Sequence, residues 1–504
     1  MTGSRVERDG PGTSLAAGAA PRAGVAGGPG AHRKGAWWPR VAAPAVAAIC
    51  VLLMFGPFTR ETVGAAAILA TVLLIFLKVP VGIALAAPAV AALYALRGPR
   101  TLETMLATVP FDAVSQWTLG VIPMFVFMGL LLARSGVTDT LYTAARHWLG
   151  WLPGGLAIGT TAAGTGLAAV SGSTVATTYT LARIGIPEML RAGYDRRVAV
   201  GSVIVAGLPG QLIPPSIFLV IYAGIAQVPV GPQLIAGIGP GLLVAFGYAT
   251  MILALCRLRP SLAGRGTGTR LDGSTWHTRL RSAARCWPVP VLITAVVGSM
   301  FTGVLTATEA GAAGALGALL LTLWYKRTDR PLSAVAGAAT DTVATVGSVF
   351  LLLIGAMILS RLLAVSGIGT GFAQWVTELG LGRVSFLLLL VAAYLVFGTF
   401  MDPLSIMLLT VPLLVPTLDT MDISLLWFGV FVVFLAELAI VTPPVGILSF
   451  IVHRIVADPE VNGGQTITLG DIFRAVAWFL PVTLVICVLL IVWPGIATFL
   501  PELM

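Results

Sequence analysis

From residue 41 onward, the sequence is a succession of long apolar runs separated by short polar breaks. The first run covers 41–58, and the others lie at about 63–96, 118–133, 154–182, 198–256, 288–324, 343–365, 384–421, 425–456 and 475–500. About 20 apolar residues cross a bilayer as one helix, and several of these runs are longer. Because a backbone within lipid must satisfy its own hydrogen bonds, the runs predict an all-α, polytopic membrane protein.

The composition excludes several classes of protein. Hydrophobic residues make up 57% of the 504 positions and charged residues 10%, whereas soluble domains contain about 45–50% and 25%. The net charge is +9, but the basic residues sit in short loops, where they set orientation in the membrane. The sequence therefore predicts a lipid bilayer as the environment and no binding of nucleic acid.

Motifs for catalysis are missing from the sequence. The four histidines lie far apart, the four cysteines form no CxxC pair, and neither a Gly-x-Ser-x-Gly nor a Gly-Lys-Ser/Thr phosphate loop occurs. We therefore expect a protein that is not an enzyme and contains no ATPase, so that any uphill transport would draw on an ion gradient.

The chain divides into four expected segments. Residues 1–40 form a Gly-, Ala-, Pro- and Arg-rich tail that is expected to be disordered, 41–256 a first membrane repeat, 257–287 an Arg-rich loop, and 288–504 a second repeat. Seven arginines and one acid fall within 257–285. An excess of arginine marks the cytoplasmic side, so the tail and the loop are expected there.

The division into two repeats is based on three pairs of landmarks. The motif at 131–137 (LLARSGV) returns at 362–368 (LLAVSGI), an offset of 231, and the same offset carries Ser171 onto Asp402. Pro214-Pro215 returns as Pro443-Pro444 at an offset of 229. Three landmarks in one order and nearly one register indicate two homologous halves.

The duplicated breaks predict a binding site. Paired prolines remove backbone donors and unwind a helix. Freed carbonyls at membrane depth survive only when they are buried in protein or line a wet cavity, and matched interruptions in two halves are typical of transporter sites. Carbonyls and hydroxyls suit a small cation, and helix N-termini suit an anionic group of a substrate.

Three carboxylates lie in apolar surroundings: Asp402, Glu309 and Glu437. Ionisable groups at membrane depth are rare and usually functional. Asp402 sits at a repeat landmark, which favours a role in an ion site, either directly or as a helix cap that holds the site. Glu309 and Glu437 are equally compatible with functional and structural roles.

Two ordered sets of motifs resemble the large membrane subunit of tripartite ATP-independent periplasmic (TRAP) transporters of the C4-dicarboxylate type. The first half contains 120–125 (GVIPMF), 169–177 (AVSGSTVAT), 186–189 (IPEM) with Gly193-Tyr194, and 212–216 (LIPPS). The second half contains 306–310 (TATEA), Asp402-Pro403, 427–430 (WFGV), Glu437 and 442–446 (TPPVG). The resemblance extends over about 45–500.

The resemblance implies a sodium-coupled importer of an organic acid in the bacterial cytoplasmic membrane. Its expected partners are a small membrane subunit and a periplasmic substrate-binding protein. The implied fold is an inverted repeat of the ion-transporter superfamily, with two re-entrant helical hairpins and two broken helices in a transport domain that slides as an elevator against a scaffold.

The resemblance also implies two groups of site residues. Na⁺ would be bound in each half, near 171–174 with 207–216 and near 398–403 with 442–446, by Ser171, Gly172, Ser173, Gly207, Gly210, Pro214, Gly398, Thr399, Asp402, Thr442 and Gly446. The substrate would contact Ser173, Thr174, Thr177, Pro215, Ser216, Pro443 and Pro444. Na⁺ is the only cofactor implied.

Some positions depart from the family pattern. Pro209 and Gln211 interrupt a stretch that usually reads Gly-x-x-Gly with apolar neighbours, and Leu448 stands where an Asn is expected. A lost amide removes both a donor and an acceptor from the expected pocket, so dicarboxylate, keto acid and sugar acid all stay open as substrates. A self-sufficient ion-coupled carrier of the same superfamily, without a binding protein, is the alternative; a membrane enzyme or an inert scaffold is disfavoured.

Overall fold

The computed structural model describes residues 38–264, 276–443 and 446–504. The expected tail therefore lies almost wholly outside the described residues, as does Pro444. Contacts divide the chain after Ala45, and the architecture below is that of Val46–Met504. Within the described residues every regular element is a helix, which confirms the all-α expectation.

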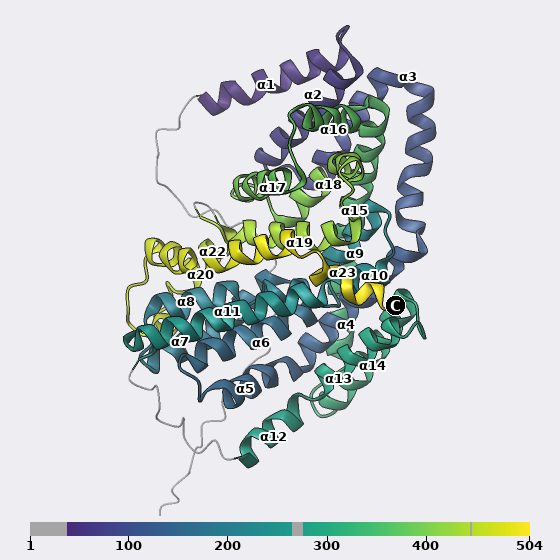
Figure 1. Ribbon diagram of the computed structural model, residues 1–504. Coiled ribbons are helices and arrows are strands. Elements are labelled where there is room, and N and C mark those ends of the chain that lie inside the picture. Colours follow the sequence, from purple (N-terminus) through teal and green to yellow (C-terminus); the bar gives the residue numbers. More distant parts are fainter. Residues whose placement is uncertain (1–37, 265–275, 444–445) are drawn as a thin grey trace, which may run out of the picture. The chain divides into compact units, whose positions relative to one another are not determined.

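The first half of the chain runs from α1 to α11 (Figure 1). Its helices are α1 (Trp38–Phe55), α2 (Arg60–Phe76), α3 (Val81–Ser115), η1 (Trp117–Gly120), α4 (Val121–Ser135), α5 (Val137–Leu149), α6 (Gly155–Ser171), α7 (Thr174–Arg191), α8 (Arg196–Val205), η2 (Pro209–Gln211), α9 (Ile217–Ala226), α10 (Val230–Ala236) and α11 (Ile238–Leu258).

The remaining helices connect the halves and build the second one. The connecting elements are η3 (Pro260–Ala263) and α12 (Trp276–Cys286). The second half contains α13 (Pro288–Phe301), α14 (Ala307–Tyr325), α15 (Pro331–Ser366), α16 (Ile368–Glu378), α17 (Arg383–Phe397), α18 (Pro403–Thr420), α19 (Leu425–Val441), α20 (Ile447–Ile455), α21 (Pro459–Asn462), α22 (Leu469–Val492) and α23 (Gly495–Glu502). Part of the predicted Arg-rich loop is thus helical, because α12 falls within it.

Seven helical segments of the described chain are long and apolar enough to cross a membrane: Val81–Ser115, Trp117–Ser135, Val230–Leu258, Ala307–Tyr325, Pro331–Ser366, Pro403–Thr420 and Leu469–Val492. The bent pair α12 and α13 passes the same test only when both are counted as one span. Shorter apolar helices include α6, α9, α17 and α19. The short helices border the polar breaks that the sequence singles out.

The two halves match in the order of their helices. The series α4 to α9 corresponds to α15 to α20, and Gly136 and Gly367 end α4 and α15 with φ of +80° and +73°. Ser135 and Ser366, just before these glycines, each donate a hydrogen bond to the carbonyl three residues earlier. Glycine adopts such positive φ values at little cost, so the sequence repeat at this junction has a conformational basis.

The core of the chain surrounds α19. All fifteen residues from Trp427 to Val441 are buried. Figure 1 shows α19 and α22 in a row beside α8 and α11, where α22 contacts α8 and α11 and α19 contacts α9, α10, α17 and α18. A helix that is apolar on all sides is a central one. The segment that ends at the second proline pair is therefore enclosed by protein.

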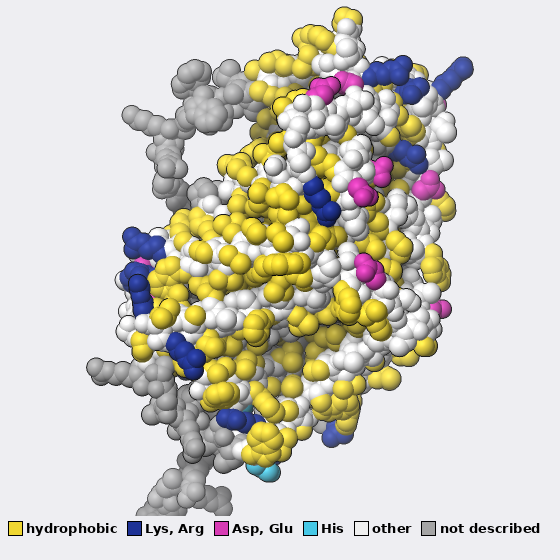
Figure 2. Space-filling model, in the orientation of Figure 1, with side chains coloured by type: hydrophobic (Ala, Val, Ile, Leu, Met, Phe, Trp, Pro, Cys, Tyr) yellow, Lys and Arg dark blue, Asp and Glu magenta, His cyan; other side chains and the backbone are white. Residues whose placement is uncertain are grey.

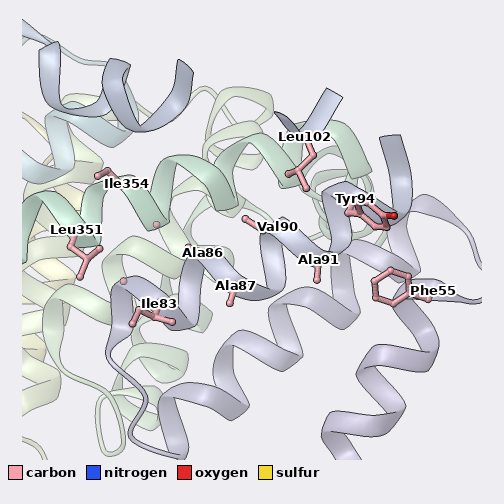
Figure 3. A pocket seen from close by; sticks show the side chains of 12 residues that line it. Phe55, Ile83, Ala86, Ala87, Val90, Ala91, Tyr94, Leu102, Leu351 and Ile354 are labelled. Carbon is pink, nitrogen blue, oxygen red and sulfur yellow. The ribbon is translucent and has the colours of Figure 1, made fainter. Parts of the chain in front are cut away.

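A separate apolar cavity of about 520 Å³ lies between α3 and α15 (Figure 3). The two helices approach each other closely where Gly82 and Gly355 line the cavity, since a Cβ on Gly355 would lie 2.5 Å from the carbonyl oxygen of Gly82. Among the side chains that line the cavity, only that of Tyr94 carries a polar atom. It therefore lacks the groups needed to bind a carboxylate.

The surface in Figure 2 is largely apolar, with Lys and Arg side chains gathered along the left and lower edges and at the upper right. Figure 2 also shows a few basic and acidic side chains within this apolar face. Two ion pairs join distant segments: Arg134 contacts Asp341 at 2.5 Å, and Arg196 contacts Asp471 at 3.2 Å.

Candidate functional site

The first polar break is the short link between α6 and α7, called here the first tip (171–174). Gly172 has a φ of +62°, which ends α6, and Ser173 caps α7 by accepting a hydrogen bond from the Ala176 amide at 3.2 Å. The hydroxyls of Ser171 and Thr177 lie 3.3 Å apart. The first tip therefore brings several hydroxyls close to the carboxyl end of α6, where the Gly172 amide donates to the Ala168 carbonyl at 2.8 Å.

The first proline pair lies in an interruption between α8 and α9, called here the first break (206–216). The break is nonhelical except for η2, and Ser216 caps α9 by accepting from the Leu219 amide at 3.3 Å. Gly207 lies against the first tip, since a Cβ there would stand 2.8 Å from Thr174 Cγ2. Gly210 lies against α6, where a Cβ would stand 2.4 Å from the Thr165 carbonyl oxygen. The chain is thus nonhelical around Pro214-Pro215, and the missing side chain at Gly207 allows close contact with the first tip.

The second polar break, called here the second tip (398–403), joins α17 to α18. Asp402 is exposed and caps α18, accepting from both the amide and the hydroxyl of Ser405. The Thr399 hydroxyl donates to the Val396 carbonyl at 2.7 Å. Because Ser173 and Asp402 both cap the helix after a tip, the structure pairs these two residues at an offset of 229, the same offset as the proline pairs.

The second proline pair lies in the interruption between α19 and α20, called here the second break (442–446). Thr442 ends α19 in an extended conformation, and its hydroxyl donates to the Leu438 carbonyl at 2.8 Å. Gly446 has a φ of +30° before α20 begins. Pro443 is half-buried, whereas Pro444 lies outside the described residues. The helix thus stops at the position that the sequence predicts.

Both tips contact the carboxyl-terminal turns of α19. The buried Thr174 hydroxyl donates to Glu437 Oε2 at 2.7 Å, and a Cβ on Gly398 would lie 1.9 Å from Ala439 Cβ. Residues two apart on a helix point to opposite sides, since each residue turns it by about 100°. The end of α19 therefore lies between the two tips, and Ala439 stands three residues before the second break at Thr442.

Several buried oxygen atoms near these segments have no hydrogen-bond partner. They are Gln211 Oε1 in the first break, Thr178 Oγ1 in α7 and Ser449 Oγ in α20, and each side chain is at most 1% exposed. Helices α7 and α20 contact each other. Buried polar atoms are rarely left unpaired without a reason. Sequence reasoning noted Gln211 only as a departure and missed Thr178 and Ser449, which a search for hydroxyls near the breaks could have found.

The remaining acid, Glu309, has a local structural role. It lies exposed in the first turn of α14 and forms a capping box with Thr306, whose amide donates to Glu309 Oε2 at 2.8 Å. Such a reciprocal cap stabilises a helix start and requires no ligand. Glu309 thus lies at the start of a candidate span and takes no part in the contacts that join the two tips to α19.

A bound cation would be held by oxygen atoms of several kinds. Among the described residues no three His, Cys, Asp or Glu side chains cluster as a metal site. Hydroxyls, backbone carbonyls and single carboxylates are available instead at the tips and breaks. Hard monovalent cations prefer such oxygen ligands, and unwound carbonyls bind coupling ions in secondary transporters.

A polytopic helical chain with matched helix breaks at a central buried helix has the architecture of a secondary transporter. Comparison with known proteins identifies the transporter family. Residues 68–496 match the family model described as tripartite ATP-independent periplasmic transporter, DctM component. The chain belongs to this family and is a TRAP transporter large permease, a multi-pass membrane protein and a member of a class that is not enzymatic.

Curated relatives carry different substrate names. The chain is 31% identical over 399 residues to the C4-dicarboxylate TRAP transporter large permease protein DctM of Pseudomonas aeruginosa, covering 79% of this chain and 89% of the relative. It is 29% identical to the sialic acid large permease SiaM of Vibrio cholerae, covering 85% and 96%. It is 29% identical to the ectoine large permease TeaC of Halomonas elongata, covering 76% and 86%.

Solved structures share the fold at low sequence identity. The YdaH transporter of Alcanivorax borkumensis superimposes with a TM-score of 0.59 at 17% identity, covering 81% of this chain and 91% of that chain. MtrF of Neisseria gonorrhoeae superimposes with a TM-score of 0.55 at 13% identity, covering 91% and 97%. These similarities concern the fold alone.

Proposed function

We propose that this permease imports an organic acid by sodium symport, together with a small membrane subunit and a periplasmic substrate-binding protein. The observation that carries the proposal is the convergence of both tips on the end of α19, through Thr174–Glu437 and Gly398–Ala439. Membership of the TRAP family supports the two partners. Two matched sets of oxygen atoms around a buried helix end are suited to ion coupling.

The first sodium site is assigned to the first tip and the first break. Its ligands are hydroxyl and carbonyl oxygens of Ser171, Gly172, Ser173, Gly207, Gly210 and Pro214. The absence of side chains at Gly207 and Gly210 supports this assignment, because it lets the backbone of the first break lie close to Thr174 of the tip and to α6. The unpaired Gln211 oxygen lies in the same break.

The second sodium site is assigned to the second tip and the second break. Its ligands are Gly398, Thr399, Asp402, Thr442 and Gly446. Asp402 would then bind the ion while it caps α18, since a carboxylate has lone pairs left after accepting two hydrogen bonds from Ser405.

The substrate carboxylate is assigned to the space near the capped amino ends of α7 and α9. The positive ends of helix dipoles and the bound ions favour an anion there. Seven residues would contact it: Ser173, Thr174, Thr177, Pro215, Ser216, Pro443 and Pro444. The three relatives described above are named for C4-dicarboxylate, sialic acid and ectoine, all of which carry a carboxylate, so a carboxylate is the shared chemistry.

The transport movement is proposed to be an elevator motion of the tips and broken helices against a scaffold. Helices α6 and α17, with 17 and 15 residues, are shorter than the roughly 20 residues that span a bilayer. Their length supports re-entrant hairpins at both tips. The Arg-rich residues 257–287 would then lie on the cytoplasmic side.

Uptake into proteoliposomes tests the proposal. The vesicles contain the chain with its small subunit, an inward sodium gradient is applied, and labelled organic acids are offered with and without the binding protein encoded alongside. Uptake that requires both sodium and the binding protein is the expected result. Sodium-driven uptake without the binding protein would favour the self-sufficient carrier, and uptake insensitive to sodium would refute ion coupling.

A further inference from the structure

Besides the apolar cavity between α3 and α15, a polar cavity of about 310 Å³ lies between α5 and α12, away from the tips and breaks. Its lining comprises Thr140, Thr143 and His147 on α5 and Thr278, Arg281, Ser282 and Arg285 on α12. The spacing places each set on one face of its helix. The volume is at the lower end of the roughly 300–1,000 Å³ typical of small-molecule sites.

Helix α12 is amphipathic, with its polar side toward α5 and its apolar side outward. Its polar stripe faces α5, whereas Leu280 on the opposite side is 49% exposed. Trp276, at the start of α12, is 64% exposed although its ring also contacts Trp148 of α5, and Trp287, just after the end of α12, is 47% exposed. An amphipathic helix beside water turns its apolar stripe inward. An outward apolar stripe is the arrangement of a helix whose outer side is covered by acyl chains.

Aromatic contacts also join α5 to α12. The Trp148 and Trp276 rings pack edge to face with centroids 5.9 Å apart, and Trp148 Nε1 donates to the Arg279 carbonyl at 3.2 Å. Helix α12 joins the apolar helix α13 at a bend of 51°. Exposed tryptophans at the end of an apolar helix are typical of the level of the lipid headgroups.

The cavity carries positive charge that the described residues do not neutralise. Neither Arg281 nor Arg285 takes part in any of the ion pairs of the described residues, and none of the lining residues whose side chains the structure describes is acidic. Burial, aided by the Arg146 charge, lowers the pKa of His147 and so favours its neutral ring. Two guanidinium groups with hydroxyls nearby match the fork geometry that phosphate oxygens require.

We propose that the cavity between α5 and α12 binds the phosphate of an anionic phospholipid, with Arg281 and Arg285 as its ligands. The acyl chains of the lipid cover the outer apolar stripe of α12. Basic pockets beside membrane helices recognise anionic headgroups in this way. The bound lipid bridges α5 to α12 and so fixes the segment that connects the two halves of the chain.

The test uses the full-length chain, purified in detergent and stripped of lipid. Phosphatidylglycerol, phosphatidylcholine and inorganic phosphate are titrated separately, and binding is followed by native mass spectrometry and by the midpoint of thermal unfolding. Phosphatidylglycerol is expected to bind the unmodified chain and raise the midpoint more than phosphatidylcholine does. Stabilisation by inorganic phosphate to the same extent would overturn the assignment to a lipid.

Variants of matched charge separate the cavity from general attraction. Arg281→Gln with Arg285→Gln should weaken phosphatidylglycerol binding by about tenfold or more, as expected for loss of charged hydrogen bonds. Arg257→Gln with Arg259→Gln removes the same charge from exposed arginines outside the cavity and should change the affinity less than about twofold. Equal effects of the two pairs would overturn the proposal.

A third pair of substitutions, Arg281→Lys with Arg285→Lys, keeps both positive charges. It replaces the glutamine pair in the test if that pair does not fold. Lysine cannot form the bidentate fork, so binding should still weaken, by about threefold or more. Unchanged affinity in this pair would remove the two guanidinium groups from the site.

Discussion

The hydrogen bond between Thr174 and Glu437 allows a quantitative test of how the halves are joined. It connects residues 263 positions apart, at 2.7 Å, and the two side chains are 3% and 1% exposed. Thr174→Val removes the hydroxyl, keeps the branched shape and leaves the carboxyl group without this donor. Losing a partner of a buried polar group costs about 1–3 kcal/mol, while hydrogen bonds between membrane helices average about 0.6 and reach about 1.7 kcal/mol.

We therefore expect Thr174→Val to lower the free energy of unfolding by about 1–2 kcal/mol. Equilibrium unfolding in mixed micelles of increasing dodecyl sulfate content measures this quantity. Thr180→Val is a matched control on the same helix, because the Thr180 hydroxyl donates only to the backbone carbonyl of Ala176. Its effect should stay within about 0.5 kcal/mol.

A double-mutant cycle isolates the contact itself. Glu437→Met replaces the carboxyl group with an apolar side chain of similar length, and the variant that combines it with Thr174→Val leaves neither partner unpaired. The cycle should give a coupling energy of about 1 kcal/mol, because removing both partners costs less than the sum of the single changes. A coupling energy below about 0.3 kcal/mol would show that the contact does not hold the first tip on α19.

Three further outcomes are expected. Gly398→Ala should lower the free energy of unfolding by about 1–3 kcal/mol and abolish uptake, because the new Cβ would meet Ala439. Gly347→Ala is the control, because open space surrounds Gly347. Equal uptake by the two variants would contradict the packing argument. Asp402→Asn keeps a capping side chain but removes the charge, so membrane insertion should persist while sodium-driven uptake is lost; normal uptake would remove Asp402 from the ion site. Ser171→Ala should raise the sodium concentration needed for half-maximal uptake, and an identical sodium titration would exclude this hydroxyl as a ligand.

Local physical rules made much of the fold predictable. Apolar run length predicted helices and spans, proline pairs predicted the interruptions at 206–216 and 442–446, and Gly136 and Gly367 were visible as a repeat before their positive φ was known. Each of these features depends on a few consecutive residues, either through backbone sterics or through the length needed to cross a bilayer.

Local rules could not predict the roles of all the carboxylates. An acid within an apolar run looks the same in the sequence whether it caps a helix or meets a distant partner. Asp402 and Glu309 are helix caps, which the surrounding residues could indicate. The partner of Glu437 could not be found in this way, because Thr174 belongs to the other half of the chain.

The sequence by itself determined the membrane-spanning class, the helix breaks and the repeat, since these depend on local composition and backbone geometry. Only the tertiary structure decided that both tips meet the end of α19, that Ser173 rather than Ser171 corresponds to Asp402, and that α12 turns its arginines toward α5. Those features depend on which distant surfaces pack together. The free energy of that packing is a property of the whole assembled chain, and no short stretch of residues encodes it.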